Sequence, residues 1–385
     1  MSDARQIEAD IYERLSKVID PELGRSVTDL GMIAAIEAAP ASSDAGTYDV
    51  TVHVELTVPG CPLSETITSQ INGAVSSYPG AQLLPHIEVG SMSRDKLADL
   101  VADLKAERKQ NPFSKPGVKT RIFAIASGKG GVGKSSVTAN LAATFAALGF
   151  DTAAIDADIY GFSLPRLFGV HTQPTNLNGM LMPVTAWGVK LISIGMFAGA
   201  DRAILWRGPR LQRSLEQFLS DVWWGEPDVL LLDLAPGTGD MAISVAQALP
   251  NAELVVVTTP QPSASDIAVR SGLVALQVPM KVRGVVENMS YYEHKGEKLE
   301  IFGAGGGQRV SEQLTQALGY DVLLMAQLPL EPEVRETGEA AGRRYWTPTA
   351  LCVRMALARP SEGWLNGCWQ CEPAQPHTFV GGVGV

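Results

Sequence analysis

The sequence feature that most constrains the fold is a glycine-rich loop, Gly128-Lys-Gly-Gly-Val-Gly-Lys-Ser135, which fits the pattern G-x-x-x-x-G-K-S. A predicted strand, Ile122–Ala126, precedes this loop, and a predicted helix, Lys134–Leu148, follows it. In that context glycines let successive backbone N–H groups turn toward a phosphate, and the helix adds the positive end of its dipole. The pattern predicts that a nucleotide phosphate contacts Gly128, Lys129, Gly130, Gly131, Val132, Gly133, Lys134, Ser135 and Ser136.

Three side chains have predictable roles in binding and hydrolysing ATP. Lys134 would reach the β- and γ-phosphates, and the Ser135 hydroxyl would bind Mg²⁺. Asp233 ends the apolar run Val229–Leu232, as expected of an aspartate that holds the Mg²⁺ water shell. The glycine-containing segment 235–240 follows, and we interpret it as a switch loop that responds to the γ-phosphate.

Two further residues are candidates for catalysis. Lys129 directly follows the first glycine of the loop. A lysine at this position is typical of dimeric ATPases, in which it reaches the partner's nucleotide like an arginine finger; the alternative is a solvated lysine at a loop tip. Asp156 and Asp158 follow the next predicted strand. We expect Asp158 to orient the attacking water or to bind Mg²⁺, with a helix cap as the alternative.

The hydrophobic patterns divide the chain into domains. Residues 1–100 combine predicted helices with the alternating strand Tyr48–Thr57, which indicates a small α+β domain. Residues 101–120 contain two prolines after a polar helix and are predicted as a linker. Across residues 121–360 buried strands alternate with amphipathic helices, which predicts an α/β P-loop fold whose mostly parallel sheet is covered on both faces. Residues 361–385 are predicted to be an irregular tail.

The α/β region has six predicted strands and four predicted helices. The strands are Ile122–Ala126, Asp151–Asp156, Val189–Ile194, Val229–Asp233, Leu254–Thr258 and Val282–Glu287. The helices are Lys134–Leu148, Leu211–Asp221, Met241–Ala248 and Ala264–Leu276.

Charge and hydropathy narrow the possible partners. The net charge is −10 and the pI about 5.1, which argues against nucleic acid or an anionic membrane as a partner. The apolar runs are far shorter than the roughly 20 residues of a membrane span, and the first residues lack the apolar stretch of a signal peptide. We therefore expect a cytoplasmic protein, in which the four cysteines act as thiols or metal ligands.

With these residues identified, the chain resembles the Mrp/ApbC family of iron–sulfur cluster carrier ATPases, within the MinD-like branch of P-loop proteins. The matching segments are Ser127–Ser135, Asp156–Gly161, Trp206–Pro209, Gln217–Leu219, Trp224-Gly225, Asp233–Asp240, Thr258–Gln261 and Val286–Ser290. The resemblance implies a homodimer that hydrolyses ATP, receives a cluster from a donor and passes it to apo-protein acceptors. It also implies that Asn288 contacts the adenine.

The N-terminal domain resembles the small domain of iron–sulfur assembly factors. The resemblance rests on Asp20-Pro-Glu22, Thr28-Asp-Leu-Gly31 and Gly60-Cys-Pro62. Cys61 would lie near the start of a helix, whose dipole favours the thiolate, and it is a candidate cluster ligand. The alternative is a small buried apolar residue.

The cysteines depart from the family's pattern at one place. The family commonly carries a Cys-x-x-Cys after the Val286–Ser290 segment, where two subunits share a cluster, but residues 291–302 contain no cysteine. Cys368 and Cys371 form a Cys-x-x-Cys in the tail. Because a [4Fe–4S] cluster takes four thiolates, two subunits supplying two each could hold one. An incidental or a redox-active pair is the alternative.

Two other functions remain open at this level. One is a nucleotide-dependent positioning or scaffold ATPase of the MinD/ParA type without a metal cluster, which the missing Cys-x-x-Cys favours. The tail counts against it, because residues 363–385 contain no Lys or Arg and no helical pattern for binding membranes. The other is a metabolic kinase or ligase, for which the sequence shows no substrate pocket.

Overall fold

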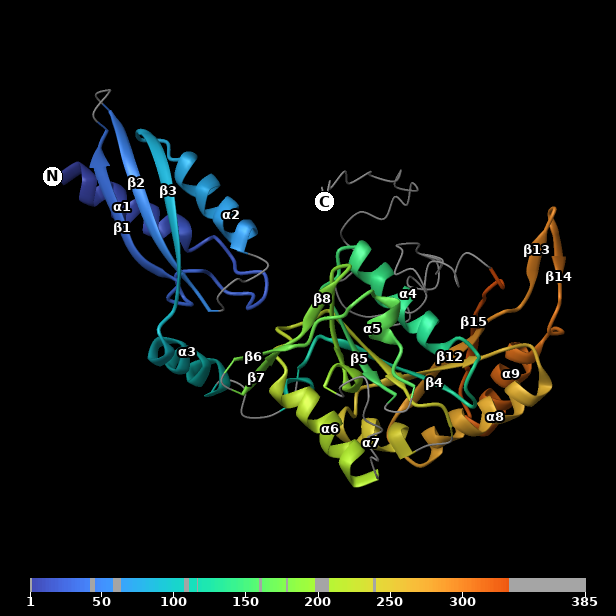
Figure 1. Ribbon diagram of the computed structural model, residues 1–385. Coiled ribbons are helices and arrows are strands. Elements are labelled where there is room, and N and C mark those ends of the chain that lie inside the picture. The colour runs from blue at the N-terminus through green and yellow to red at the C-terminus, as the bar shows by residue number, and fades with distance from the viewer. Residues whose placement is uncertain are drawn as a thin grey trace.

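The computed structural model describes residues 2–41, 46–57, 64–106, 111–115, 117–158, 161–177, 179–197, 208–237 and 240–331. These residues form a small N-terminal domain and a larger domain (Figure 1). No helix in this described part of the chain is long and apolar enough to cross a membrane.

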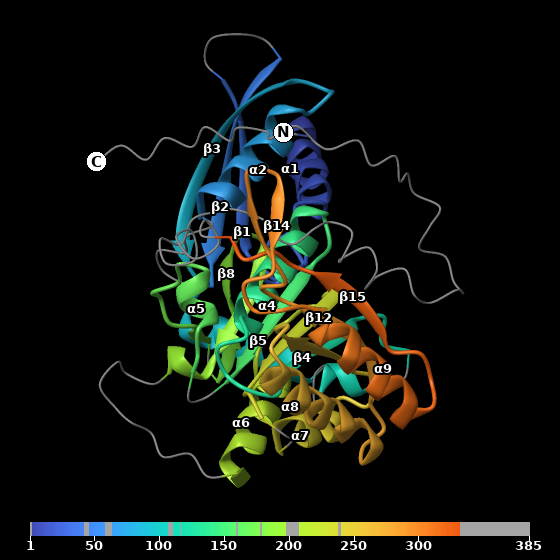
Figure 2. The same ribbon diagram turned by 90° about the vertical axis from the view of Figure 1, so that its right-hand side faces the viewer.

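The small domain consists of a three-stranded sheet with two helices packed on one face (Figure 2). Its elements are α1 (Ser2–Leu15), β1 (Ile33–Pro40), β2 (Thr47–Leu56), α2 (Ser64–Ser76) and β3 (Gln82–Ser91). The central strand β2 runs antiparallel to β1 and parallel to β3. Its alternation places Val50, Val52, Val54 and Leu56 in the core, as the sequence predicts. The third strand, β3, pairs with β2 along its whole length.

The segment predicted as a linker contains regular structure among its described residues. The helix α3 (Arg94–Ala106) extends into it, followed by a single 3-10 turn, Pro112–Ser114. Phe113 is buried in the core of the larger domain, and the Asn111 side chain donates a hydrogen bond to Ala248 O at 2.9 Å. The end of the segment is therefore fixed to the larger domain by an aromatic side chain and a hydrogen bond.

The described residues of the larger domain form an eight-stranded sheet of order β15-β12-β11-β4-β10-β5-β9-β8. All neighbouring strands are parallel except β8, which is antiparallel to β9. The strands are β4 (Arg121–Ser127), β5 (Thr152–Ala157), β8 (Val184–Ala186), β9 (Val189–Ser193), β10 (Val229–Leu234), β11 (Glu253–Thr258), β12 (Lys281–Glu287) and β15 (Leu323–Gln327). The predicted mostly parallel P-loop sheet is confirmed.

Helices cover both faces of this sheet (Figure 1). On one face lie α4 (Lys134–Ala147) and α5 (Leu164–Leu167), whose apolar residues share a buried cluster. The opposite cluster is packed by α6 (Gly208–Asp221), α7 (Asp240–Ala248), α8 (Pro262–Gly272) and α9 (Gly306–Leu318). Apolar strands buried on both sides, as in β10 where every residue is buried, require this double cover.

Several elements are absent from the sequence prediction. Two hairpins, β6–β7 (Thr175–Leu177 and Met180–Met182) and β13–β14 (Tyr292–His294 and Glu297–Leu299), have strands of three residues each. Strands this short give no readable periodicity. The helix α9 was also missed; it begins at Gly306-Gly307, two residues with the lowest helix propensity after proline.

The two domains meet at the β6–β7 hairpin and the end of α6. Met180, Met182 and Trp223 belong to the buried cluster that contains the core of the small domain. The Trp223 indole Nε1 donates a hydrogen bond to Leu23 O at 3.3 Å. Leu23 directly follows the Asp20-Pro-Glu22 turn of the small domain, so this turn lies against the larger domain.

Candidate nucleotide-binding site

The predicted phosphate-binding loop connects β4 to α4. A side chain at Gly128 would collide with the backbone of Ile267 and Ala268 in α8, so only glycine fits there. Gly131 has φ +81°, a conformation that favours glycine. A Cβ at Gly130 or Gly131 would meet no atom within 4 Å. The loop therefore has free space beside its central glycines, where a phosphate can be accommodated.

The end of β10 brings the predicted Mg²⁺ ligands to this loop. Strand β10 neighbours β4 in the sheet, which places Asp233 beside the first turn of α4. The Lys134 Nζ lies 2.7 Å from Asp233 Oδ1, and the Ser135 hydroxyl donates to Asp233 Oδ2 at 2.5 Å. Lys134, Ser135 and Asp233 thus form one cluster beside the loop, and their roles toward phosphate and Mg²⁺ stay predictions.

A third donor to Asp233 was missed at the sequence level. The Thr138 hydroxyl lies 2.8 Å from Asp233 Oδ1 and 3.0 Å from the Lys134 carbonyl oxygen. Thr138 is one helical turn after Lys134, so both side chains lie on the same face of α4. The i, i+4 spacing of Lys134 and Thr138 was the sequence signal that could have identified Thr138 as a neighbour of this site.

The Lys134–Asp233 ion pair is deeply buried. The side chain of Lys134 is 6% exposed and that of Asp233 is 0% exposed. Charges in such a site are desolvated, so each depends on its partner and its hydrogen bonds. A cationic and a hydroxyl donor around a buried carboxylate are the groups needed to bind a phosphate together with a hard cation.

Asp156 and Asp158 occupy different surroundings at the end of β5. Asp156 is fully buried, and its Oδ2 accepts hydrogen bonds from the backbone N–H groups of Ser163 and Leu164 at 3.0 and 3.1 Å. It is therefore a cap of α5. Burial, and next the charge of Asp233, raise the pKa of Asp156 to about 7. Asp158 is buried and accepts a hydrogen bond from Gly161 N at 3.0 Å, which closes a local turn; its catalytic role stays a prediction.

Lys129 lies at the tip of the loop, over the start of α8. Its Nζ is 3.3 Å from Ser263 Oγ and 3.5 Å from Gln261 Oε1. Within the described part of the chain no carboxylate lies within salt-bridge distance of Lys129. The N-terminus of a helix carries a partial positive charge, which does not stabilise a lysine. Among the described residues the contacts of the ammonium group are thus long and to uncharged acceptors, and its action on a partner's nucleotide stays a prediction.

Asn288 joins the end of β12 to the phosphate-binding loop. Its side-chain Nδ2 donates to Val132 O at 2.9 Å, and its backbone N–H donates to Thr258 O at 2.8 Å. A Cβ at Gly133 would collide with the Asn288 amide, so the Asn288 side chain also packs closely against Gly133. Contact of Asn288 with an adenine stays a prediction.

Two residues near Asn288 were not predicted. Glu287 is fully buried, and its Oε1 accepts hydrogen bonds from the Ser290 hydroxyl and the Gln327 amide, both at 2.8 Å, which fixes the backbone before Asn288. Thr259 follows β11, and its hydroxyl is buried without a hydrogen-bond partner among the described residues. An unpaired buried hydroxyl at the carboxyl edge of the sheet is compatible with a polar ligand there.

All four cysteines lie outside the described residues, including the predicted cluster ligands Cys61, Cys368 and Cys371. The Trp206-Arg207 segment lies outside them as well. Among the described residues no group of three His, Cys, Asp or Glu side chains is arranged to hold a metal ion. In the cysteine-free segment 291–302 the β13–β14 hairpin projects from the larger domain (Figure 1), and His294 stacks on Tyr292 with ring centroids 6.1 Å apart.

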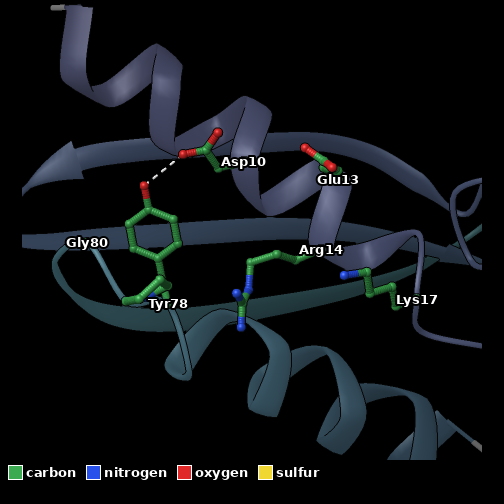
Figure 3. Close-up of a pocket in the computed structure, with 7 residues that line it drawn as sticks. Asp10, Glu13, Arg14, Lys17, Tyr78 and Gly80 are labelled. Atoms are coloured by element: carbon green, nitrogen blue, oxygen red, sulfur yellow. Dashed lines mark hydrogen bonds between the residues drawn. The ribbon is translucent and has the colours of Figure 1, made fainter.

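A separate pocket of about 370 Å³ lies on the small domain, between α1 and the loop after α2 (Figure 3). The Tyr78 hydroxyl donates to Asp10 Oδ2 at 2.8 Å. The Arg14 guanidinium donates to Ala74 O and Ser77 O, each at 3.0 Å. Arg14 therefore caps the end of α2, and Tyr78, Asp10 and Arg14 all have hydrogen-bond partners within the small domain.

Comparisons with known proteins identify the family of this chain. A family model described as NUBPL iron-transfer P-loop NTPase matches residues 118–350, and one described as iron–sulfur cluster assembly protein matches residues 8–82. The chain is 46% identical over 339 residues to the iron–sulfur cluster carrier protein of Mycobacterium tuberculosis H37Rv, covering 87% of each chain. It is 35% identical to the iron–sulfur cluster carrier protein of Bacillus subtilis, covering 84% of this chain and 88% of the relative.

A solved structure gives the same result. It is a nucleotide-binding protein from Archaeoglobus fulgidus in complex with ADP, 31% identical, with a TM-score of 0.50 over 64% of this chain and 93% of that chain. The family predicted from the motifs is confirmed: the chain belongs to the iron-transfer P-loop NTPases, with an iron–sulfur cluster assembly domain at its N-terminal side.

Proposed function

We propose that this protein binds and hydrolyses ATP and uses the nucleotide cycle to load iron–sulfur clusters and transfer them to apo-proteins. The observation that carries the proposal is the convergence of Lys134, Ser135 and Asp233 beside a glycine loop, in a chain that also contains an iron–sulfur assembly domain. The names of the relatives support a carrier over a positioning ATPase without a cluster.

In the nucleotide site, Lys134 would bind the β- and γ-phosphates, and Ser135 and Asp233 would hold Mg²⁺. When bound, Mg²⁺ neutralises charge on the phosphate oxygens. Lys134 has to leave Asp233 to reach a phosphate, so its contact with the carboxylate is exchanged for one with the nucleotide. Asp158 would orient the attacking water, and Asn288 would contact the adenine.

The active unit in this proposal is a homodimer in which Lys129 acts on the partner's nucleotide. Its support is the weak local hold on the Lys129 ammonium group at the start of α8. A cation supplied across an interface stabilises the charge that develops during phosphoryl transfer. Hydrolysis would then depend on assembly of the dimer.

The cargo of this carrier would be a [4Fe–4S] cluster held by Cys368 and Cys371 of two subunits. Four thiolates complete the ligand set of such a cluster, and reduced thiols fit the cytoplasm. Cys61 is the alternative ligand, in the assembly domain. Iron–sulfur donors and apo-protein acceptors are the implied partners; nucleic acid and membranes are not.

Anaerobic reconstitution with iron and sulfide tests this proposal. The expected result is a stoichiometric cluster that can be transferred to an apo-acceptor, and its loss in the Cys368→Ser/Cys371→Ser double variant. The fourth cysteine, Cys352, is not a candidate ligand, so Cys352→Ser is the matched control and should load normally. Cys61→Ser decides the role of the assembly domain. Lys134→Ala should abolish hydrolysis, and with it any effect of ATP on cluster loading and transfer. A wild-type protein that takes up no iron or sulfide would contradict the carrier function.

A further inference from the structure

Thr138 differs from an ordinary helical threonine. Its side chain is fully buried, and its hydroxyl lies 3.0 Å from the carbonyl oxygen four residues earlier and 2.8 Å from Asp233 Oδ1. Among the described residues the hydroxyl of Thr144, further along α4, makes only the local type of contact, 2.7 Å from Asn140 O. A hydroxyl has one proton, and a carboxylate is the stronger acceptor because it is charged. Thr138 therefore has a partner outside its helix that Thr144 lacks.

The other donors to Asp233 are the ones that nucleotide binding redirects. Among the described residues three side chains donate to this carboxylate, namely those of Lys134, Ser135 and Thr138. In the proposed function Lys134 turns to the phosphates and Ser135 to Mg²⁺. Thr138 lies a full turn further into α4, away from the loop, and its contact with Asp233 need not change.

Leaving the carboxylate of Asp233 without hydrogen bonds would destabilise the site. This carboxylate is fully buried, and a buried charge that loses its donors either rotates or destabilises the site. One fixed donor on Oδ1 restricts rotation and leaves Oδ2 available. The donor on the rigid part of α4 is thus the one that can keep Asp233 oriented in the loaded site.

We propose that Thr138 is a positioning residue whose hydroxyl holds the Asp233 carboxylate in place for Mg²⁺ when nucleotide is bound. This inference rests on the proposed function in one respect, the role of Asp233 toward Mg²⁺. It assigns Thr138 no contact with the nucleotide itself.

The test is a titration of a fluorescent ADP analogue, in EDTA and at increasing Mg²⁺ concentration. Thr138→Val removes the hydroxyl at nearly constant volume. We expect it to raise the Mg²⁺ concentration of half-maximal effect about tenfold or more, the factor of a hydrogen bond to a charged group. The affinity for the analogue in EDTA should stay within about threefold of wild type. Thr138→Ser should restore the Mg²⁺ response, and the matched control Thr144→Val should leave it unchanged.

Each contrary result has a distinct meaning. An unchanged Mg²⁺ response in Thr138→Val, or an equal shift in Thr144→Val, would overturn the role of Thr138. Absence of any Mg²⁺ response in the wild type would overturn the magnesium site as well, and so marks a failure of the proposed function. If the valine variant does not fold, Thr138→Ala compared with Thr144→Ala makes the same decision.

Discussion

The buried Lys134–Asp233 pair predicts that Asp233→Asn strengthens nucleotide binding in the absence of Mg²⁺. The atoms Lys134 Nζ and Asp233 Oδ1 are 2.7 Å apart, in side chains 6% and 0% exposed. Removing one charge of such a pair costs about 3–5 kcal/mol, because the other remains buried without a counter-charge. An asparagine oxygen that still accepts a hydrogen bond recovers about 1 kcal/mol.

The nucleotide-free variant should therefore lose about 2–4 kcal/mol of unfolding free energy. A bound phosphate would return the missing negative charge to Lys134. ADP should thus bind about tenfold more tightly or better, since each 1.4 kcal/mol changes affinity by about a factor of ten. Hydrolysis should be lost in the same variant, because the carboxylate proposed to hold Mg²⁺ is gone.

Isothermal titration with ADP in EDTA, combined with urea unfolding with and without ADP, measures both effects. Asp151→Asn is the matched control: its carboxylate pairs with Lys190 Nζ at 2.9 Å but is 43% exposed, so its loss should cost only about 0–1 kcal/mol. An Asp233→Asn variant that binds ADP in EDTA no better than wild type would refute the competition between carboxylate and phosphate.

Three further predictions concern other parts of the molecule. Lys129→Ala should lower the hydrolysis rate by about 10³-fold or more if the lysine acts across a dimer, with ADP affinity nearly unchanged; a rate close to wild type would place it outside catalysis. Trp223→Ala, at the contact between the domains, should cost about 3 kcal/mol and release the small domain, seen as a larger radius of gyration in solution scattering, whereas an unchanged radius would show that the hairpin suffices. The pKa of Asp156 is raised from 3.8 to about 7 in the folded protein, so between these pH values the folded protein keeps a proton that the unfolded chain has lost. The contribution of protonated Asp156 to stability is therefore full below pH 3.8 and is lost as the pH rises to about 7. Urea unfolding between pH 4 and 7 should show this decline, and Asp156→Asn should flatten it; an equal slope in the variant would assign the decline to other groups.

Local sequence was enough to identify the loop and its helix. The residues that make Gly128–Ser135 a phosphate-binding loop are adjacent in sequence, so the pattern can be recognised locally. The positions of Lys134 and Ser135 follow from the start of α4. The run Val229–Leu232 is apolar throughout because β10 is buried on both faces, so Asp233 could be placed at the carboxyl edge of the sheet. Fold class and family followed from the same motifs.

The order of the strands in the sheet decides which side chains these residues contact, and local periodicity does not encode that order. Asp233 meets α4 because β10 lies beside β4, and only this juxtaposition gives Thr138 an acceptor outside its helix. Asn288 reaches Val132 across 156 positions of sequence, and Trp223 reaches Leu23 across 200. A side chain's type limits what it can bind, but which group it meets depends on contacts between segments that are distant in the chain. For this protein the sequence alone determined the nucleotide-binding loop, and the tertiary structure decided which residues hold Asp233 beside that loop.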